Sequence, residues 1–447
     1  MKLDKNIFLK SIAISLIIIS FFLGYFLREN ASGGGLEFYN LSWPIINSFK
    51  KDFFFTINNY GSFGDGSFPL AHIINAYLNP FSNNDVNLQL SITFISLIVF
   101  LLFAISIKQH FPHVRSIDIY LTSTAILLLP FFRASAFWGK PENFSWLFFI
   151  ISLYFFLQIK PNISKEPNKK KIFNIIFFCF FSACTLYVRQ SFIFLPISYF
   201  LYLLLYKAHK RIIIISAISF FILAIPGLLL IIEWKGLYDN ENFDGYFVSF
   251  VNPKYIIKNI PIIFSFFGFY LFPILIIELI RDGYKNIFFK YSKAFLSFFV
   301  FLIILHFIGM LDYLSNYTIG GGAILKLNYL IKQNNYFLLL IFSSFGFGIV
   351  VNLLKDDLKN NAVFILPIFV IYGFPNILYQ EYFEPLILII FFLALKTNLH
   401  KVYFHKVGLS CSIFLLYFTT YLLGSIYFKH FVFSSLEDWK NYLLQIQ

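Results

Sequence analysis

The stretch LQLSITFISLIVFLLFAISI, residues 88–107, runs without a single charged side chain. A helix rises about 1.5 Å per residue, so about 20 residues cross the roughly 30 Å hydrocarbon core of a bilayer. Backbone N–H and C=O groups find no water in that core, and a helix satisfies them within one segment. The stretch therefore predicts a transmembrane α-helix.

The composition indicates that such segments fill most of the chain. Apolar residues make up 59% of the 447 residues and charged residues only 13%, whereas a soluble domain has about 45–50% and about 25%. The sequence predicts thirteen spans, near 7–27, 88–107, 117–132, 143–159, 172–188, 191–206, 212–232, 259–280, 294–311, 336–354, 362–378, 383–395 and 407–428. Lysines precede the first span and no small-residue cleavage site follows it, so we interpret it as a retained signal anchor.

The distribution of basic residues orients these spans. With a cytoplasmic N-terminus, the inside segments carry 22 of the 35 lysine and arginine residues, although the outside segments are about twice as long in total. This bias supports the cytoplasmic N-terminus and the count of thirteen. Acidic residues show the reverse, because fifteen of 22 fall outside. The formal charge of +13 therefore reflects membrane topology, and no nucleic-acid partner is expected.

The longest outer segment is the first one, residues 28–87. Within 43–55, apolar and aromatic residues alternate with a Lys-Lys-Asp triplet, as in helices that lie in the membrane interface. The other sizeable outer loops are 233–258 and 312–335. No internal repeat or soluble domain is visible, so we treat residues 1–447 as one all-α transmembrane bundle.

Several common signatures of catalysis are absent from the sequence. There is no phosphate-binding Gly-x-x-x-x-Gly-Lys, dinucleotide glycine fingerprint, His-Glu-x-x-His, Gly-x-Ser-x-Gly or Asp-x-Asp. Cys179, Cys184 and Cys411 lie in apolar runs and indicate neither a disulfide framework nor a metal cluster. The membrane interior is nearly free of ionisable groups, with Glu278 near an inner end and His306 within a span. Ion-coupled transporters usually carry paired charges at mid-depth, so this pattern argues against ion-coupled transport.

Polar residues collect instead at the outer ends of the spans. The clusters are Glu37, Asp65 to His72 (DGSFPLAH), Arg133 to Glu142 (RASAFWGKPE), Tyr187 to Ser191 (YVRQS) and Tyr379 to Pro385 (YQEYFEP). At this depth, a water-soluble acceptor can meet a lipid that is embedded in the membrane.

The order of these clusters resembles the GT-C superfamily of polytopic glycosyltransferases, and most of all its dolichyl-phosphoglucose-dependent α-1,2-glucosyltransferases. Those enzymes have an acidic pair after the first helix, an Asp-Pro and Pro-Pro-Gly-Leu stretch, a mid-chain Arg-Gln, and an Arg-Tyr-Phe-x-x-Pro segment. In this chain their places are taken by Glu37, by Asp65 with the Phe-Pro-Leu run at 68–70, by Arg189-Gln190, and by residues 381–385. Two departures are Leu36 in the acidic pair and Glu381 in place of the terminal arginine.

The resemblance implies an inverting enzyme that moves a sugar from a polyprenyl-phosphate donor to an acceptor hydroxyl on the outer membrane face. Inversion needs one carboxylate as general base. The leaving phosphate needs a cation, and the planar fork of arginine suits it. The candidate bases are Glu37 and Asp65, and the sequence leaves open which one acts. The candidate phosphate ligands are Arg189, Gln190, Arg133 and Lys140, and the candidate substrate-lining residues are His72, Glu142, Glu381 and Tyr382.

The expected partners are a lipid-linked sugar donor, a glycan or lipid-linked oligosaccharide acceptor, and membrane lipid. No cofactor or metal ligand set is indicated, and dependence on a divalent cation stays open. We expect a multi-pass protein of a bacterial plasma membrane rather than of the endoplasmic reticulum. One alternative is a surface-polysaccharide polymerase, although such proteins usually carry their large outer loop late in the chain. A second is a non-enzymatic lipid-linked sugar transporter or flippase, which predicts a mid-depth polar cavity and repeated helices.

Overall fold

A computed structural model describes residues 5–31, 34–65, 67–234, 253–308, 322–324, 327, 337–375 and 378–432. The predicted all-α class is confirmed, because the structure is 85% helix and no strand occurs among these residues. Within the same ranges, nine helices are long and apolar enough to cross a membrane, or up to eleven if two bent pairs each form one span. The chain forms two compact units: unit 1 contains Met1–Ser11, Thr124–Phe131 and Gly245–Gln447, and unit 2 contains Ile12–Ser123 and Phe132–Asp244.

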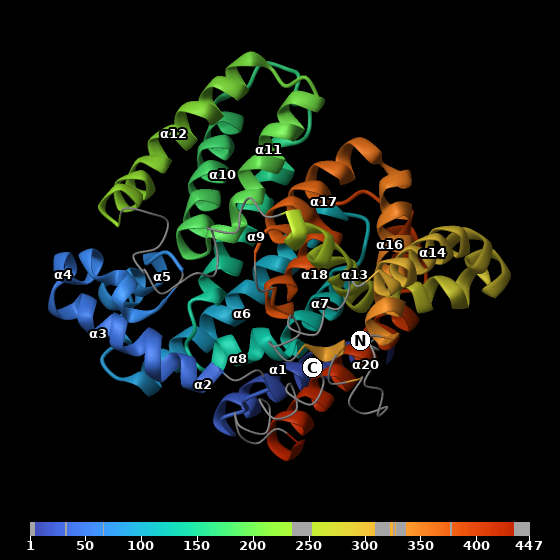
Figure 1. Ribbon diagram of the computed structural model, residues 1–447, viewed down its shortest axis with the longest axis horizontal. Helices are drawn as coiled ribbons and strands as arrows, with labels where there is room; N and C mark the ends of the chain where they lie inside the picture. The colour runs from blue at the N-terminus through green and yellow to red at the C-terminus, as the bar shows by residue number, and fades with distance from the viewer. Residues whose placement is uncertain are drawn as a thin grey trace. The chain divides into compact units, whose positions relative to one another are not determined.

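Unit 2 is built around three long helices, α6 (Asp85–His110), α9 (Glu142–Ile159) and α10 (Lys169–Val188). α9 packs against both of the others, and α12 (Lys210–Glu233) packs against α10 (Figure 1). Buried polar side chains join these helices, since the Thr93 hydroxyl lies 3.0 Å from the Ala136 carbonyl and the Asn143 amide donates to the Ser96 hydroxyl. Such bonds help helices to associate in lipid, where apolar contact alone gives little preference.

The two ends of unit 2 differ in the loops that they hold. At one end, the Lys171 ammonium donates to the Pro161 and Asn162 carbonyls at 2.7 and 2.9 Å. The His209 N–H donates to the Ile163 carbonyl at 3.1 Å at the same end. The loops 160–171 and 207–211 therefore lie together, as expected for two loops on one side of a membrane.

The opposite end of unit 2 holds the segments that were predicted to lie outside. The Tyr25 hydroxyl, near the end of α1 (Lys5–Phe26), donates to the Val86 carbonyl at the start of α6, at 3.2 Å. The Trp138 indole N–H donates to the Glu29 carbonyl at 3.0 Å. Successive loops along the sequence thus lie at alternate ends of this unit, as transmembrane helices require. Their assignment to the cytoplasmic or outer face stays a prediction from the basic residues.

The segment predicted as the first outer loop folds into short helices. They are α2 (Gly34–Glu37), η1 (Phe38–Ser42), α3 (Trp43–Lys51), α4 (Phe53–Asn58), η2 (Tyr60–Phe63), α5 (Leu70–Ile73) and η3 (Ile74–Leu78). Asp52 has an extended backbone, and its carboxylate accepts the Phe55 N–H at 2.9 Å, which caps the start of α4. α3 buries Ile45, Ile46 and Phe49 on one face and ends in two lysines, so it is amphipathic as expected.

Unit 1 is organised around α13 (Pro253–Asp282), which packs along α16 (Phe337–Asp356). The unit also contains α14 (Tyr284–Phe307), α17 (Leu358–Gly373) and α20 (Val407–Tyr427). Two glycines allow α13 and α16 to touch, because a Cβ on Gly268 would collide with the Phe342 carbonyl and one on Gly346 with the Phe264 carbonyl. Close backbone approach through small residues is a common way of packing helices in lipid.

The predicted span 117–132 is bent, and the predicted span 383–395 ends at a second bend. Residues 116–137 form α7 (Ser116–Ser123), η4 (Thr124–Leu128) and α8 (Pro130–Phe137), with a bend of 74°. Pro130 has no N–H and disfavours a helical conformation at the residue before it, which explains the break. The second bent pair runs through η8 (Gln380–Phe383) and α18 (Leu386–Leu393), and then turns by 92° into α19 (Asn398–His405). These bends could not be predicted from hydropathy, because hydropathy reports how apolar a segment is and not the direction of its helix axis.

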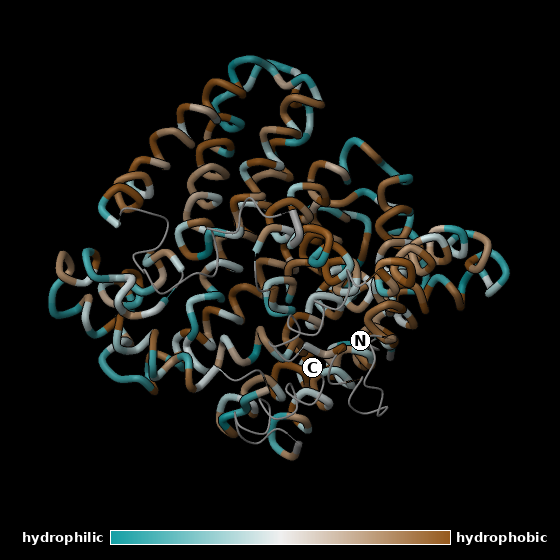
Figure 2. The backbone as a smooth tube through the Cα atoms, in the orientation of Figure 1, coloured by the Kyte–Doolittle hydropathy of each residue, from teal (hydrophilic) through white to brown (hydrophobic). Residues whose placement is uncertain are grey.

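Each of the remaining predicted spans overlaps a helix within its described residues. Two of them are short, η5 (Gln190–Ile193) with α11 (Phe194–Leu205), and α17. Figure 2 shows apolar colour along the helices and hydrophilic colour at many of the turns. These features fit an integral membrane protein, while the count of thirteen, the single domain and the orientation stay predictions. The predicted loops 233–258 and 312–335 lie largely outside the described residues.

Candidate functional site

A tight turn between α8 and α9 places two of the predicted site residues. Gly139 follows α8 with φ +64°, and the Lys140 N–H then donates to the Ser135 carbonyl at 3.0 Å. This closes the helix in a Schellman motif. Glycine adopts this left-handed conformation readily, and a Cβ at position 139 would also lie 3.0 Å from the Phe38 ring. Because α9 begins at Glu142, Lys140 and Glu142 both belong to this one turn.

Charged side chains from three segments form a continuous row, which we call the charge chain (Glu37, Lys140, Glu142 and Arg189). The Lys140 ammonium lies 2.5 Å from the Glu37 carboxylate and 3.9 Å from the Glu142 carboxylate. An Arg189 N–H donates to Glu142 Oε1 at 3.2 Å. Glu37 ends α2, and Arg189 directly follows α10. The fold therefore brings together four candidate residues that are far apart in the sequence.

Three members of the charge chain are nearly sealed from solvent. The side chains of Lys140, Glu142 and Arg189 are 2%, 4% and 15% exposed, whereas that of Glu37 is 42% exposed. Taking an ion out of water costs several kcal/mol unless partners compensate its charge. Here acids and bases alternate, and the position of Glu142 at the start of α9 adds a favourable interaction with the helix dipole.

The compensation of Glu142 is incomplete. Its Oε1 accepts from Arg189, but its buried Oε2 has no hydrogen-bond partner in the part of the chain that the structure describes. Buried polar atoms nearly always have a partner, so each exception calls for an explanation. Oε2 can accept a hydrogen bond from a bound molecule while the two cations hold the charge of the carboxylate.

Arg189 owes its position to the end of α10. Its backbone is extended, with φ −142° and ψ 115°, while its N–H still bonds the Thr185 carbonyl at 2.9 Å. An arginine at a helix end often extends its side chain toward water, but this guanidinium is largely buried against Glu142. Gln190, the second residue of the predicted Arg-Gln motif, is half-buried and begins η5.

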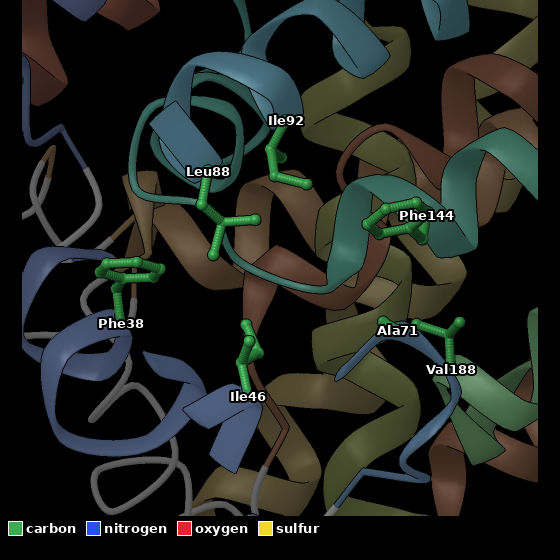
Figure 3. Close-up of a cluster of buried hydrophobic side chains, with 7 residues drawn as sticks. All are labelled: Phe38, Ile46, Ala71, Leu88, Ile92, Phe144 and Val188. Carbon is green, nitrogen blue, oxygen red and sulfur yellow. The ribbon is translucent and has the colours of Figure 1, made fainter. Parts of the chain in front are cut away.

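A buried apolar cluster holds the segments of the site together. Its members are Phe38, Ile46, Ala71, Leu88, Ile92, Phe144 and Val188 (Figure 3). Single members adjoin Glu37, His72 and Arg189 in the sequence, and Phe144 lies two residues after Glu142. Apolar burial contributes about 25 cal/mol per Å². The positions of the charged side chains are thus tied to the core of unit 2 rather than to their own attraction alone.

A second polar cluster contains Tyr60, Asp65 and His72. The Tyr60 hydroxyl lies 2.9 Å from His72 Nδ1 and 3.3 Å from Asp65 Oδ2. Asp65 Oδ1 accepts the N–H and the hydroxyl of Ser67 at 2.9 and 2.7 Å. His72 Nε2 lies 3.6 Å from Asp65 Oδ2, and it is buried without a hydrogen-bond partner among the described residues. Neutral donors therefore hold the Asp65 carboxylate in place.

Burial lowers the pKa of His72, and the negative charges of Asp65 and Glu142 partly offset this effect. The imidazole is therefore neutral near pH 7. Burial, followed by the charge of Asp65, raises the pKa of Tyr60, so its hydroxyl keeps its proton. The Tyr60 ring also stacks on Trp234 with an interplanar angle of 9°. The influence of Glu142 on His72 connects this cluster electrostatically with the charge chain.

Arg133 lies in a separate ion pair. Its guanidinium donates to both oxygens of Glu29 at 2.8 and 2.6 Å, and to the Ser20 carbonyl at 2.9 Å. The rings of Phe21 and Phe137 lie against it, with their centroids 5.5 and 5.2 Å from Cζ. The sequence predicts Arg133 to be a phosphate ligand. In the structure its charge is taken up by a bidentate pair that ties the end of α1 to α8.

The last predicted cluster belongs to unit 1. Glu381 and Tyr382 lie in η8 and are half-buried. The Tyr382 ring contacts those of Tyr372 and Tyr379, with centroid distances of 6.2 and 5.5 Å. These contacts place both residues in an aromatic part of unit 1, and their role as substrate-lining residues stays a prediction.

The buried acid of that segment is Glu384, which is 1% exposed. Its Oε2 accepts the Tyr270 and Tyr421 hydroxyls at 2.7 and 2.9 Å, and its Oε1 accepts the Phe131 N–H at 2.6 Å. Gln380 extends the network by donating to the Tyr270 hydroxyl at 2.8 Å. Both carboxylate oxygens are hydrogen-bonded, so this network has the character of a structural support.

Sequence reasoning missed several residues of these networks. Glu29 could have been suspected, because it is an acid directly after the first span. Glu384 stood in a recognised motif but was not singled out from its neighbours. Tyr60 carried no signal in a sequence with 28 tyrosines, because only the fold brings its hydroxyl to Asp65 and His72.

The charge chain offers two carboxylates and two cations. No group of three or more His, Cys, Asp or Glu side chains that could hold a metal ion occurs within the described ranges. No protein-family model, curated protein or solved structure matches this chain.

Proposed function

We propose that this chain is a membrane glycosyltransferase that moves a sugar from a polyprenyl-phosphate donor to an acceptor hydroxyl, with inversion at the anomeric carbon. The observation that carries the proposal is the charge chain, in which two acids and two cations from three segments meet at one end of unit 2. Buried ion pairs add little net stability compared with apolar packing. A buried row with an unsatisfied carboxylate oxygen is therefore better explained by binding and chemistry.

Lys140 and Arg189 are suited to bind the phosphate of the donor. A phosphodiester keeps its negative charge at neutral pH, and charge-assisted hydrogen bonds from Lys and Arg are stronger than neutral ones. Glu142 lies between the two cations, 3.9 Å from the Lys140 ammonium and 3.2 Å from the Arg189 guanidinium. It thereby fixes their spacing and acts as a positioning residue.

Glu37 is the better candidate for the general base. Its carboxylate is 42% exposed, so an acceptor from solution can reach it. Asp65 is 15% exposed, and both of its oxygens already face Ser67, Tyr60 or His72. Little of the Asp65 carboxylate is therefore open to an acceptor hydroxyl. We therefore assign Asp65 to positioning.

The reaction balances with these groups alone. The acceptor oxygen forms a bond to the anomeric carbon on the face opposite the phosphate, and its proton passes to Glu37. The bond from the anomeric carbon to the phosphate oxygen breaks, and its electron pair leaves with the polyprenyl phosphate. The positive charges of Lys140 and Arg189 stabilise the negative charge that grows on the leaving oxygen.

The proposal can be tested with the full-length protein in liposomes. Radiolabelled polyprenyl-phosphate glucose and polyprenyl-phosphate mannose serve as parallel donors, with a glycolipid extract as acceptor, and chromatography measures transfer of the label. The native protein should transfer one of the sugars. Glu37→Gln should lower the rate by about 10²- to 10⁴-fold, the range for loss of a general base.

Asp85→Asn is a matched control for this experiment. Asp85 lies at the start of α6 and accepts the Tyr39 hydroxyl at 3.0 Å, so the variant removes the same charge outside the charge chain. It should transfer sugar at the native rate. Full activity in each of Glu37→Gln, Asp65→Asn and Arg189→Ala would overturn the proposal, and so would the absence of transfer from every donor.

A further inference from the structure

The Lys140 ammonium is a buried cation whose partner on the solvent side is an acid. Lys140 is 2% exposed, and the carboxylate 2.5 Å from it belongs to Glu37, which is 42% exposed. On its other side Lys140 faces Glu142, which is 4% exposed. The two acids that flank this lysine therefore differ tenfold in their contact with water.

The two acids also differ in how firmly they are held. Glu142 starts the long helix α9 and interacts with both Lys140 and Arg189. Glu37 ends α2, which continues directly into η1 and α3, so its backbone is fixed, but its side chain is 42% exposed. Rotation of this side chain into water is a much smaller change than movement of the buried Glu142 carboxylate.

A carboxylate and a phosphate oxygen are alternative partners for the same ammonium. Both are anionic acceptors with similar hydrogen-bond lengths, near 2.7–2.9 Å for charge-assisted bonds. An anion that reaches Lys140 from the solvent side meets Glu37 first, because Lys140 itself is buried. Binding there must either displace Glu37 or be repelled by it.

We propose that Glu37 occupies the anion position on Lys140 in the free protein, and that the phosphate of a lipid-linked donor displaces it. This inference rests on the proposed function. The displaced carboxylate loses its cation and becomes a stronger base at the moment when the donor is in place. Displacement of Glu37 by the phosphate then links donor binding to activation of the base. Glu142 holds Lys140 and Arg189 in position throughout.

The exchange predicts that Glu37 opposes binding of the phosphate while it supports transfer. Farnesyl phosphate is a suitable probe, because it carries the phosphate and a short polyprenyl chain but no sugar. Its affinity is measured by titration calorimetry on the full-length protein in detergent. Glu37→Gln should bind farnesyl phosphate about three- to fivefold more tightly than the native protein, since one half-exposed ion pair no longer competes.

Three further proteins make the measurement specific. Asp85→Asn removes the same charge away from Lys140 and should bind with native affinity. Lys140→Gln should lose most of the affinity, and Glu37→Gln combined with Lys140→Gln should not regain it. Inorganic phosphate is a second probe: an equal gain for both probes attributes the exchange to the phosphate group alone, and a gain for farnesyl phosphate only attributes it to the lipid-linked form.

The outcomes separate this inference from the proposed function. If the native protein binds farnesyl phosphate and Glu37→Gln binds it no more tightly, the exchange is wrong although the transferase proposal stands. If neither protein binds farnesyl phosphate, both proposals are overturned. A gain of the same size in Asp85→Asn would also overturn the exchange, because it would reflect overall charge and not competition for Lys140.

Discussion

Unit 2 contains two ion pairs that join the segment after α1 to the region of α8, and they are built differently. Arg133 and Glu29 form a bidentate pair whose side chains are 2% and 9% exposed, between two phenylalanine rings. Lys140 and Glu37 meet through a single ammonium, and one partner is 42% exposed. We call Arg133–Glu29 the closed pair and Lys140–Glu37 the open pair, because only the second has a member in contact with water.

The difference separates an ion pair that is held fixed from one that can exchange partners. A bidentate pair that is sealed by apolar side chains cannot exchange partners without a large cost, because either charge alone would be buried. A pair with one exposed member can exchange, because the released carboxylate is solvated. Geometry and exposure therefore decide the role, whereas residue type alone suggested phosphate binding for both Arg133 and Lys140.

The largest expected effect on stability comes from breaking the closed pair. Arg133→Met leaves the buried Glu29 carboxylate without its guanidinium, which should lower the free energy of unfolding by about 3–5 kcal/mol. Chemical denaturation in detergent, followed by circular dichroism, measures the change. Glu37→Gln should lower the free energy of unfolding by less than Arg133→Met does, because Glu142 still faces the buried Lys140 ammonium at 3.9 Å.

The double variant Arg133→Met with Glu29→Gln tests the reason for that loss. It removes both charges, and replacement of a whole buried pair is often nearly neutral. It should therefore be more stable than Arg133→Met alone. If the double variant is less stable than the single one, the loss comes from packing against Phe21 and Phe137 and not from an unpaired charge.

A smaller effect is expected from Gly139→Ala, which disturbs the open pair and spares the closed one. A non-glycine residue at φ +64° costs about 1–2 kcal/mol, and the new Cβ would press on Phe38. Because Lys140 follows directly, sugar transfer should fall by about tenfold or more, since small misplacements of catalytic groups are costly. Stability and transfer rate are measured on the same preparation.

Gly283→Ala is the matched control for Gly139→Ala. Gly283 has φ +79° in the turn between α13 and α14, and nothing lies within 4 Å of its Cβ position. With ψ 155°, Gly283 lies in a region that is essentially restricted to glycine. The variant should therefore lose at least as much stability as Gly139→Ala and keep its transfer rate. Equal losses of transfer in both variants would show that strain alone, and not the position of Lys140, limits the reaction.

Some features of the fold and of the site could be predicted from the sequence, and others could not. Runs such as residues 88–107 determined the helical class, because hydrophobicity and length suffice to recognise a helix of this kind. The convergence of Glu37, Lys140, Glu142 and Arg189 could be expected from alternating loops, which bring outer ends together. The bend at Pro130 was missed, since the hydropathy of the segment stays high through the break.

The ion pair of Arg133 could not be predicted for a different reason. Its partner Glu29 lies 104 positions away in the sequence, and the pairing depends on Gly24, where a Cβ would collide with the guanidinium. Nothing local in the sequence marks that contact. Networks such as Glu384 with Tyr270 and Tyr421 are hidden in the same way, because their members come from separate helices of unit 1.

The smallest expected effect concerns pH, through His72, which couples to the charge chain by way of Glu142. The pKa of His72 is lowered in the folded protein because of burial, so the unfolded chain binds this proton more readily. Stability then rises with pH where the unfolded state holds more protons. As the pH falls through the unfolded value of about 6.5, the folded state should lose stability progressively.

His72→Asn isolates this contribution. Asparagine can keep a hydrogen bond to the Tyr60 hydroxyl near the position of Nδ1, but it does not titrate. The apparent melting temperature of the native protein should fall between pH 7.5 and 5.5 more steeply than that of the variant. The difference should be modest, because the negative charges of Asp65 and Glu142 partly offset the lowering of the His72 pKa by burial. Parallel curves for the two proteins would mean that groups other than His72 cause the acid sensitivity.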